Sequence, residues 1–216
     1  MTLSRSDLSR IRGIVFDAFG TTCRGEPLSK FVPWHESLPH AERQLLLDRW
    51  MAGEVGPAEL IAYGDRRQAP PLDVLAQTLE VGLDEVHVYS DVPPVLEALS
   101  GRGYRLATAS NLVAPFGRAL ERELGAWMDG FALSYEVGAL KPDRRMFEAA
   151  ARHLEMSADQ ILVVGDSVTD DIEGAHALGM ASIQVDRSGT VADTIASLEP
   201  LLSLLSKPAD TEPPHF

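Results

Sequence analysis

The sequence has a single cysteine, Cys23, among its 216 residues, which excludes an internal disulfide bond. It also lacks any hydrophobic run close to the ~20 residues of a membrane-spanning helix, and residues 1–10 are too polar for a secretory signal. Because no histidine lies near Cys23 in the sequence to activate its thiol, we do not expect a nucleophilic cysteine. These absences favour a globular protein of the cytoplasm.

Basic residues are scarce: 19 Lys and Arg stand against 32 Asp and Glu, which gives a formal net charge of −13. Such a surface repels nucleic acid and anionic membranes, so we expect neither as a partner. It also repels small anions at long range. A site for a phosphate or carboxylate group must therefore supply its own local positive charge.

One stretch organises the chain, namely Ile14-Val15-Phe16-Asp17-Ala18-Phe19-Gly20-Thr21-Thr22. An apolar run closed by a glycine turn is typical of a buried strand, which we expect over residues 10–17. Asp17 then lies at the carboxyl end of that strand, where ligands bind in open α/β sheets. It is a candidate nucleophile, although an aspartate that ends a strand and caps a turn is the alternative.

Residues 24–90 differ in character from the rest of the chain. Six prolines lie in this region, and no strand is evident in it. Helix-forming residues with an apolar face predict helices over residues 41–51, 57–63 and 72–81. We therefore expect a small helical insert between the first strand and the remaining elements.

Beyond residue 91, short apolar runs alternate with segments of helical periodicity. This spacing is typical of βαβ units, so we expect an α/β fold with a Rossmann-like parallel sheet and helices on both faces. The tail, residues 207–216, holds three prolines and is expected to be disordered. The predicted strands are 104–109, 131–135, 161–164 and 181–185, and the predicted helices are 92–101, 116–124, 147–154, 170–178 and 192–205.

Polar side chains follow several of these strands. In a parallel sheet the carboxyl ends of the strands lie at one edge, so we expect these groups to form one site. They are Asp17, Ser110-Asn111, Lys141-Pro142-Asp143, and Gly165-Asp166-Ser167 with Asp170 and Asp171.

Carboxylates gathered in one site repel each other strongly when all are ionised. Lys141 offsets about one of these charges, and a divalent cation would offset the rest. Because Mg²⁺ prefers carboxylate and carbonyl oxygens, the sequence predicts a magnesium site near Asp17, Asp166 and Asp171. An alternative is that Asp170 and Asp171 only stabilise a helix N-terminus, which leaves Asp166 unexplained.

Together and in this order, the stretches resemble the haloacid dehalogenase superfamily of hydrolases. The resemblance covers residues 11 to about 198. It implies a core formed by residues 1–23 and 91–206, with residues 24–90 as a helical cap. The residues that carry it are Asp17-Ala18-Phe19-Gly20-Thr21, Ser110-Asn111, Leu140-Lys141-Pro142-Asp143 with Phe147, and Gly165-Asp166-Ser167 with Asp171.

The resemblance implies a role for each matching residue. Asp17 would attack the substrate and form an aspartyl ester or phosphate. Ser110 and the backbone around Asn111 would bind the transferring group, Lys141 would stabilise developing charge, and the Thr21 hydroxyl would support the nucleophile loop.

The metal ligands implied by the resemblance are the carboxylates of Asp17, Asp166 and Asp171 together with the backbone carbonyl of Phe19. Phe19 is also a departure from the family pattern, because its phosphatases carry a second aspartate at that position. This aspartate protonates the leaving group, and such assistance is worth about 10²–10⁴-fold. Hydrolysis of phosphomonoesters by the usual route should then be crippled or rerouted.

An aromatic at the position of Phe19 resembles the 2-haloacid dehalogenases of the same superfamily. These enzymes do not use Mg²⁺, usually lack an acid at the position of Asp166, and need a cap arginine, for which Arg43 and Arg49 are candidates. We give Asp166 more weight than Phe19, because carboxylates without a balancing cation would oppose the binding of an anionic substrate.

The favoured prediction is therefore a Mg²⁺-dependent phosphatase-type hydrolase of a small phosphorylated metabolite, with an acyl phosphate as one suitable substrate. A metal-independent 2-haloacid dehalogenase and a catalytically weak binding or regulatory member remain alternatives. The partner expected in each case is a small molecule, and no feature of the sequence indicates a particular oligomeric state.

Overall fold

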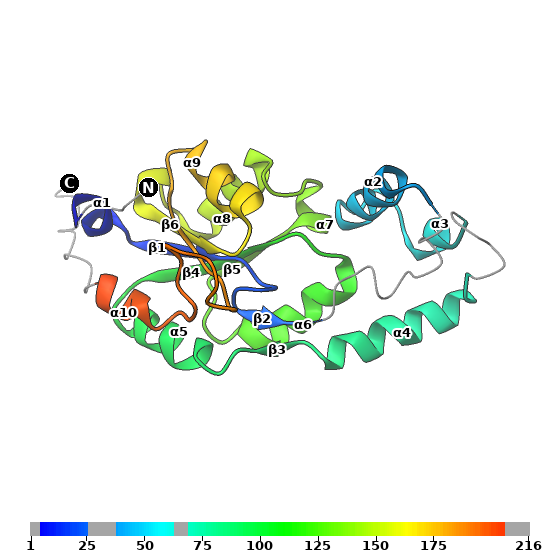
Figure 1. Cartoon of the computed structure of the whole chain (residues 1–216), viewed down its shortest axis with the longest axis horizontal. Helices are drawn as coiled ribbons and strands as arrows, with labels where there is room; N and C mark the ends of the chain where they lie inside the picture. The colour runs from blue at the N-terminus through cyan, green and yellow to red at the C-terminus, as the bar shows by residue number, and fades with distance from the viewer. Residues whose placement is uncertain (1–4, 26–37, 63–68, 206–216) are drawn as a thin grey trace.

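The computed structural model describes residues 5–25, 38–62 and 69–205, and its centre is a five-stranded parallel sheet. The strand order is β5-β4-β1-β6-β7 (Figure 1). The strands are β1 (Gly13–Phe16), β4 (Arg105–Ser110), β5 (Gly130–Leu133), β6 (Ile161–Gly165) and β7 (Ala181–Gln184). The predicted α/β fold with a Rossmann-like sheet is confirmed.

Strand β1 lies in the middle of the sheet and is buried along its whole length. Its last residue, Phe16, is paired with Thr108 of β4 on one side and Val164 of β6 on the other. Strands covered on both faces read as continuous apolar runs, which explains why β1 was visible in the sequence. The next residue, Asp17, therefore leaves the sheet at its centre.

Helices cover both faces of the sheet (Figure 1). One face carries α5 (Val92–Gly101), α6 (Ala114–Leu124) and α10 (Pro200–Leu204). The other carries α8 (Arg144–Leu154) and α9 (Gly174–His176). None of the helices within the described ranges is long and apolar enough to cross a membrane.

The core has two parts, one on each side of the sheet. Leu96 of α5 and Leu120 of α6 are fully buried on one side, and Phe147 of α8 is fully buried on the other. Burying a side chain of this size contributes about 1.5–3 kcal/mol relative to leaving it exposed. These contacts fix the sheet against its helices and so hold the strand ends in place.

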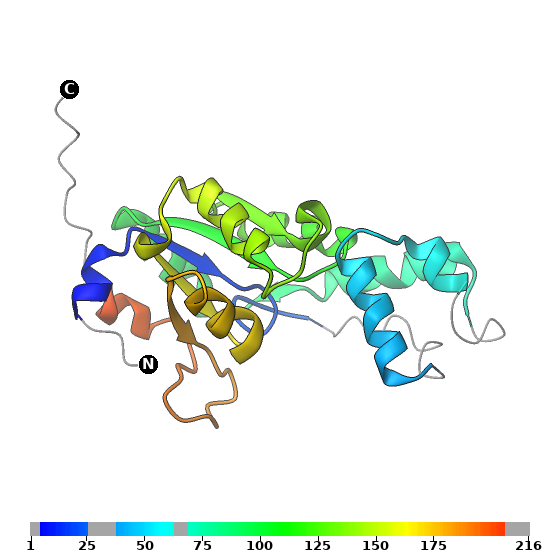
Figure 2. The same cartoon turned by 90° about the horizontal axis from the view of Figure 1, so that it is seen from above.

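The predicted helical insert contains α2 (His40–Met51), α3 (Pro57–Ala62) and α4 (Leu72–Asp84). We call these three helices together the helical segment. It extends to one side of the sheet in both views (Figures 1 and 2). Helix α4 packs against α6, and α2 packs against the short helix α7 (Ser134–Val137). The predicted helices are confirmed, except that α4 runs on to Asp84 and that Tyr63 lies outside the described residues.

Two short strands, β2 (Cys23–Arg24) and β3 (His87–Val88), were not predicted. They pair antiparallel, with Cys23 opposite Val88 and Arg24 opposite His87. Two-residue strands are too short to produce a detectable alternation of apolar and polar residues. This ribbon takes the chain from the core to the helical segment and back.

Three boundaries were predicted wrongly near the ends of elements. Arg10 closes α1 (Arg5–Arg10) and does not begin the first strand, which starts at Gly13. The strand expected over 131–135 ends at Leu133, because Ser134 begins α7. The helix expected over 170–178 is a π-helical turn, η4 (Val168–Glu173), followed by α9.

The helix predicted over residues 192–205 forms only from Pro200 to Leu204, as α10. The carboxylate of Asp186 accepts the amide protons of Thr190 and Val191, both at 2.7 Å, and so holds an irregular loop. Ile195 then bridges to Val185 beside β7. Pro200, which lacks an amide proton, begins a helix more readily than it continues one. The tail, residues 207–216, lies outside the described residues.

Candidate active site

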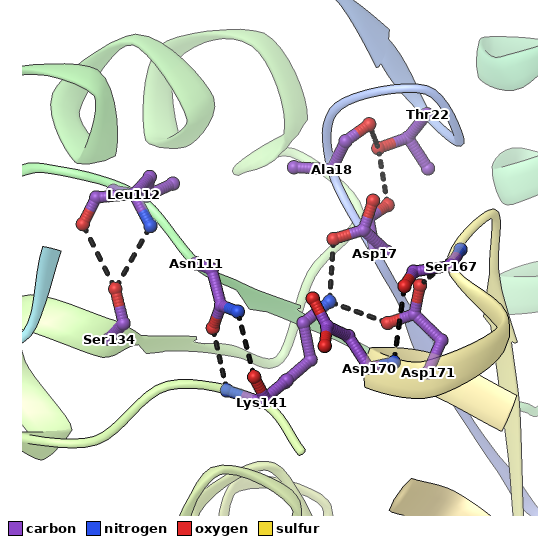
Figure 3. Close-up of polar contacts among 10 residues, drawn as sticks. All are labelled: Asp17, Ala18, Thr22, Asn111, Leu112, Ser134, Lys141, Ser167, Asp170 and Asp171. Atoms are coloured by element: carbon purple, nitrogen blue, oxygen red, sulfur yellow. Dashed lines mark hydrogen bonds and ion pairs between the residues drawn. The ribbon is translucent and has the colours of Figure 1, made fainter. Parts of the chain in front are cut away.

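Three buried charged side chains meet at the carboxyl edge of the sheet (Figure 3). The Nζ atom of Lys141 lies 2.6 Å from Oδ1 of Asp17 and 2.6 Å from Oδ1 of Asp171. Asp17 follows β1, Lys141 precedes α8, and Asp171 belongs to η4. The site therefore gathers residues more than a hundred positions apart in the sequence around one ammonium group.

A third carboxylate, that of Asp166 directly after β6, completes an acidic cluster. One carboxylate oxygen from each of Asp17, Asp166 and Asp171 lies within 4.8 Å of the others. Asp166 is the exposed member. Gly20, with φ +85°, lies so close to Asp166 that a Cβ atom would collide with its carboxylate. The positive φ favours glycine here, and a larger residue would displace the Asp166 carboxylate from the loop after Asp17.

The electrostatics of the cluster follow from burial and from the excess of negative charge. Burial raises the pKa of Asp17 to about 7, with Asp171 and Asp166 adding to the rise and Lys141 opposing it. Burial and Asp171 also raise the pKa of Asp166 above its usual value. Burial alone would lower the pKa of Lys141, but Asp17 and Asp171 together raise it, so the ammonium stays charged. One lysine does not balance three carboxylates.

The loop after Asp17 is held by its own backbone and by Thr22. The Thr22 hydroxyl donates to the carbonyl oxygen of Asp17 at 3.0 Å. The amides of Thr22 and Cys23 both donate to the carbonyl of Ala18, at 2.9 and 2.7 Å. Sequence reasoning overlooked Thr22, and the only indication of its role was the pair of hydroxyls in this loop.

Thr21 is fully buried, and its hydroxyl has no hydrogen-bond partner in the described part of the chain. Its carbonyl accepts a hydrogen bond from Nε of Arg187 at 3.1 Å. Arg187 also forms an ion pair with Asp91 at 2.8 Å and lies over the ring of Tyr89. The backbone of Thr21 therefore anchors the loop after Asp17 through Arg187. Arg187 in turn holds Tyr89 and Asp91, where the chain returns from the helical segment.

Ser110 and Asn111 follow the neighbouring strand at the same edge. Ser110 is the last residue of β4 and is buried. The side-chain amide of Asn111 accepts from the Lys141 backbone nitrogen at 2.7 Å and donates to the Lys141 carbonyl at 3.0 Å. Asn111 thus holds the backbone of Lys141 much as a neighbouring strand would. It fixes the position from which the Lys141 side chain extends toward the carboxylates.

The side chain of Phe19 is partly buried and packs against the core. Its ring meets that of Phe116 edge to face, with the centroids 5.9 Å apart. Within the described ranges, no group donates a hydrogen bond to the carbonyl oxygen of Phe19. The Phe19 side chain is thus engaged in packing and does not belong to the charged cluster.

Other residues considered in the sequence do not join this cluster. Cys23 is buried, and burial raises the pKa of its thiol to about 12, which keeps it protonated. Arg49 pairs with Glu54 at 3.1 Å on the surface of the helical segment. Arg43 lies near His40 of the same helix. Neither arginine contacts Asp17 or Lys141.

A model of the haloacid dehalogenase-like hydrolase family matches residues 11–179. The chain is 28% identical over 210 residues to phosphoserine phosphatase of Thermus thermophilus, covering 88% of this chain and 84% of that protein. It is 28% identical over 201 residues to (S)-2-haloacid dehalogenase of Pseudomonas sp. strain YL, covering 84% and 85%. The similarity thus reaches phosphatases and dehalogenases alike.

Other curated relatives are matched over only part of their length. Ribulose-1,5-bisphosphate 5-phosphatase of Halopiger xanaduensis is 28% identical over 156 residues, which is 71% of this chain and 59% of that protein. The chain spans about half the length of four such phosphatases, from 43% to 59%.

Solved structures of other proteins have a similar fold. One is that of a haloacid dehalogenase-family enzyme from Bacteroides thetaiotaomicron in complex with magnesium and inorganic phosphate. It matches with a TM-score of 0.64 at 16% identity, covering 84% of this chain and 97% of that chain. At this level of identity the match concerns the fold alone.

Proposed function

This chain belongs to the haloacid dehalogenase-like hydrolase family, and we propose that it is a Mg²⁺-dependent phosphatase-type hydrolase of a small phosphorylated metabolite. The observation that carries the proposal is the acidic cluster of Asp17, Asp166 and Asp171 around a single lysine. A phosphate group brings further negative charge to this site. Without a cation, the cluster would repel the substrate that Asp17 has to attack.

The residues present fit a magnesium ion. Three carboxylates offer oxygens within 4.8 Å of one another, and hard oxygen ligands are those that Mg²⁺ prefers. Among the described residues, the Asp166 carboxylate accepts a hydrogen bond only from its own backbone amide, and no group donates to the Phe19 carbonyl. We propose Asp17, Asp166, Asp171 and the Phe19 carbonyl as ligands. When bound, the ion would neutralise charge on the phosphate and on the carboxylates.

Asp17 is the proposed nucleophile. Lys141 occupies its Oδ1 atom at 2.6 Å, which fixes the carboxylate and leaves Oδ2 without a hydrogen-bond partner within the described ranges. Oδ2 would attack phosphorus as the bond from phosphorus to the leaving-group oxygen breaks, giving an aspartyl phosphate that water then hydrolyses. Lys141 would stabilise the charge on the transferring group, and Ser110 would donate a hydrogen bond to it.

The leaving group must depart without help from Phe19, since a phenyl ring carries no proton to give. Among the described residues the Phe19 ring is engaged with Phe116. An oxygen of low basicity, such as the carboxylate of an acyl phosphate, needs no protonation as it departs. We therefore propose an acyl phosphate or another phosphate with an acidic leaving group as the substrate class.

Residues 24–90 are proposed as a cap over this site, on a core of residues 1–23 and 91–206. The position of the helical segment supports this assignment, because α2 reaches α7 beside the carboxyl edge of the sheet. The substrate's remaining parts would then be selected by side chains of α2–α4. The closed site would keep water away until the aspartyl phosphate has formed.

A 2-haloacid dehalogenase is the second candidate, and Phe19 is the observation that favours it. Halide leaves without a proton, so a site that lacks an acid at this position suits it. Two observations weigh against it: Asp166 adds charge that an anionic haloacid would meet, and Arg43 and Arg49 lie apart from the cluster. The relative from Pseudomonas sp. strain YL keeps this candidate open to test.

The deciding experiment compares acetyl phosphate, p-nitrophenyl phosphate and 2-chloropropionate, each with millimolar Mg²⁺ and with EDTA. The proposal expects phosphate release from the first two substrates with Mg²⁺ only, and no halide release. Chloride release that persists in EDTA would establish the dehalogenase instead. No turnover of any substrate, in a protein whose melting temperature responds to Mg²⁺, would favour a binding or regulatory role.

A further inference from the structure

A buried hydroxyl, that of Ser134, lies between the helical segment and the loop that follows β4. Ser134 is the first residue of α7 and is fully buried. Its Oγ atom lies 2.7 Å from the carbonyl oxygen of Met51, the last residue of α2. It also accepts the amide proton of Leu112 at 2.9 Å and lies 3.0 Å from the Leu112 carbonyl (Figure 3).

A serine hydroxyl has one proton, so Ser134 can donate to only one of the two carbonyls at a time. The carbonyl of Met51 belongs to the last turn of α2, where carbonyl groups have no partner within the helix. The shorter distance, 2.7 Å, favours donation to Met51 over donation to Leu112. Ser134 thereby joins the end of α2 to the loop after β4.

The backbone next to this contact is also closely packed. Gly53, just beyond α2, has φ +71°. A Cβ atom at this position would lie 2.7 Å from the carbonyl oxygen of Tyr135. No larger residue allows α2 and α7 to approach this closely without a shift. The end of α2 is thus seated on α7 by a hydrogen bond and by backbone contact.

From Leu112 the connection continues to the cluster of charges. Its neighbour Asn111 binds both the backbone nitrogen and the carbonyl of Lys141, at 2.7 and 3.0 Å. The ammonium of Lys141 in turn contacts Asp17 and Asp171. Apart from the peptide bond that joins Asn111 to Leu112, each link from Met51 to the carboxylates is a hydrogen bond between described residues. Figure 3 shows the links from Ser134 onward.

We propose that Ser134 is a positioning residue that couples the seating of α2 on α7 to the placement of Lys141, through Leu112 and Asn111. When α2 is seated, Ser134 donates to Met51 and holds the loop in the arrangement in which Asn111 fixes Lys141. When α2 moves away, the hydroxyl donates to the Leu112 carbonyl instead, and this change of partner shifts the loop that carries Asn111. The kinetic part of this inference rests on the proposed function, and its structural part does not.

The first test measures backbone amide exchange by NMR in the full chain. In S134A the amide of Leu112 loses its acceptor, so faster exchange there is expected under any account. Coupling additionally predicts that the Lys141 amide, which does not contact Ser134, exchanges about tenfold faster. An unchanged Lys141 amide beside a faster Leu112 amide would overturn the proposal.

The matched control is S182A. Ser182 is also buried, and its hydroxyl also forms a hydrogen bond, with the His176 side chain at 2.9 Å, but it lies on β7. Its removal should leave the exchange of the Lys141 amide unchanged. If S134A does not fold, S134C serves in its place, because a thiol nearly keeps the volume but is a weak donor and acceptor.

The second test is a double-mutant cycle on the turnover of acetyl phosphate. S134A should lower kcat about tenfold with KM within about twofold, and S182A should change neither. Because Ser134 acts through Asn111, S134A in the N111A background should cause little further loss. Losses that multiply in the double variant would contradict coupling along this path. If no substrate is turned over, the proposed function fails, and the exchange test still decides the inference.

Discussion

The ring of Phe19 packs edge to face against that of Phe116, with the two centroids 5.9 Å apart. Phe116 is buried in the first turn of α6, so this contact places the Phe19 side chain at the boundary of the core. In the phosphatases that this sequence resembles, an aspartate is expected at the position of Phe19. In this chain the phenylalanine at that position has a packing role instead.

F19D should restore a general acid and at the same time remove the aromatic contact. We expect the free energy of unfolding to fall by about 2 kcal/mol, since the ring is only partly buried. Rates on alkyl phosphates should rise relative to rates on aryl phosphates, because help from an acid grows with the basicity of the leaving group. Steady-state rates on both substrate types and urea unfolding provide the measurements.

F19A is the matched control for F19D, because it removes the same ring without adding an acid. Both variants should lose similar stability, while only F19D should shift the alkyl-to-aryl ratio. If the folded F19D protein is no faster than F19A on alkyl phosphates, the site is built for leaving groups that need no proton.

D17N should abolish turnover of every substrate, by more than about 1,000-fold, because the amide cannot serve as the nucleophile. The variant should remain folded, since Lys141 keeps Asp171 as a partner at 2.6 Å. Activity assays on purified D17N, with circular dichroism to establish its fold, make the measurement. Substantial residual activity would remove the covalent mechanism.

Magnesium should raise the melting temperature of the wild-type chain, because a ligand that binds only the native state stabilises it by mass action. The gain corresponds to about 2.7 kcal/mol at a hundred times Kd. D166A should erase this gain. D170A is the control, because Asp170 belongs to η4 but its carboxylate is outside the cluster of three. The melting temperature of D170A should still rise with Mg²⁺. Equal responses in the two variants would count against Asp166 as a ligand.

The raised pKa of Asp17 makes stability depend on pH when metal is absent. Its native pKa is about 7, against about 3.9 in the unfolded chain, so the native state binds more protons between these values. The free energy of unfolding should therefore fall as pH rises from about 4 to about 7 in EDTA. D17N should show a shallower fall. Urea titrations at several pH values compare the two, and parallel curves would mean that Asp17 ionises normally.

The parts of the site that could be predicted are those carried by buried strand ends. Asp17 and Asp166 each follow an apolar run that both faces of the sheet cover, and such runs are visible in a single sequence. Because parallel strands share one edge, the meeting of these two residues followed from topology. Lys141 lies beyond α7, and its place beside them depends on the loop before α8.

What could not be predicted depends on single contacts between distant segments. Ser134 looks like any polar residue at the end of a strand, and only the folded chain reveals Met51 beside it. The two-residue strands β2 and β3 have no periodicity of their own. The loop after β7 was mistaken for a helix because the capture of its amides by Asp186 depends on the folded backbone.

The pairing of Arg24 with His87 makes the whole helical segment the loop of a β-hairpin. The cost of closing a loop rises only slowly with its length, so segments of very different size could be closed at this point. Replacing the helical segment would leave the register of β1 and its neighbours unchanged, because the β2–β3 ribbon lies outside the five-stranded sheet. Selectivity could thus diversify at this junction independently of the chemistry, and a new specificity would need a new insert but no new core.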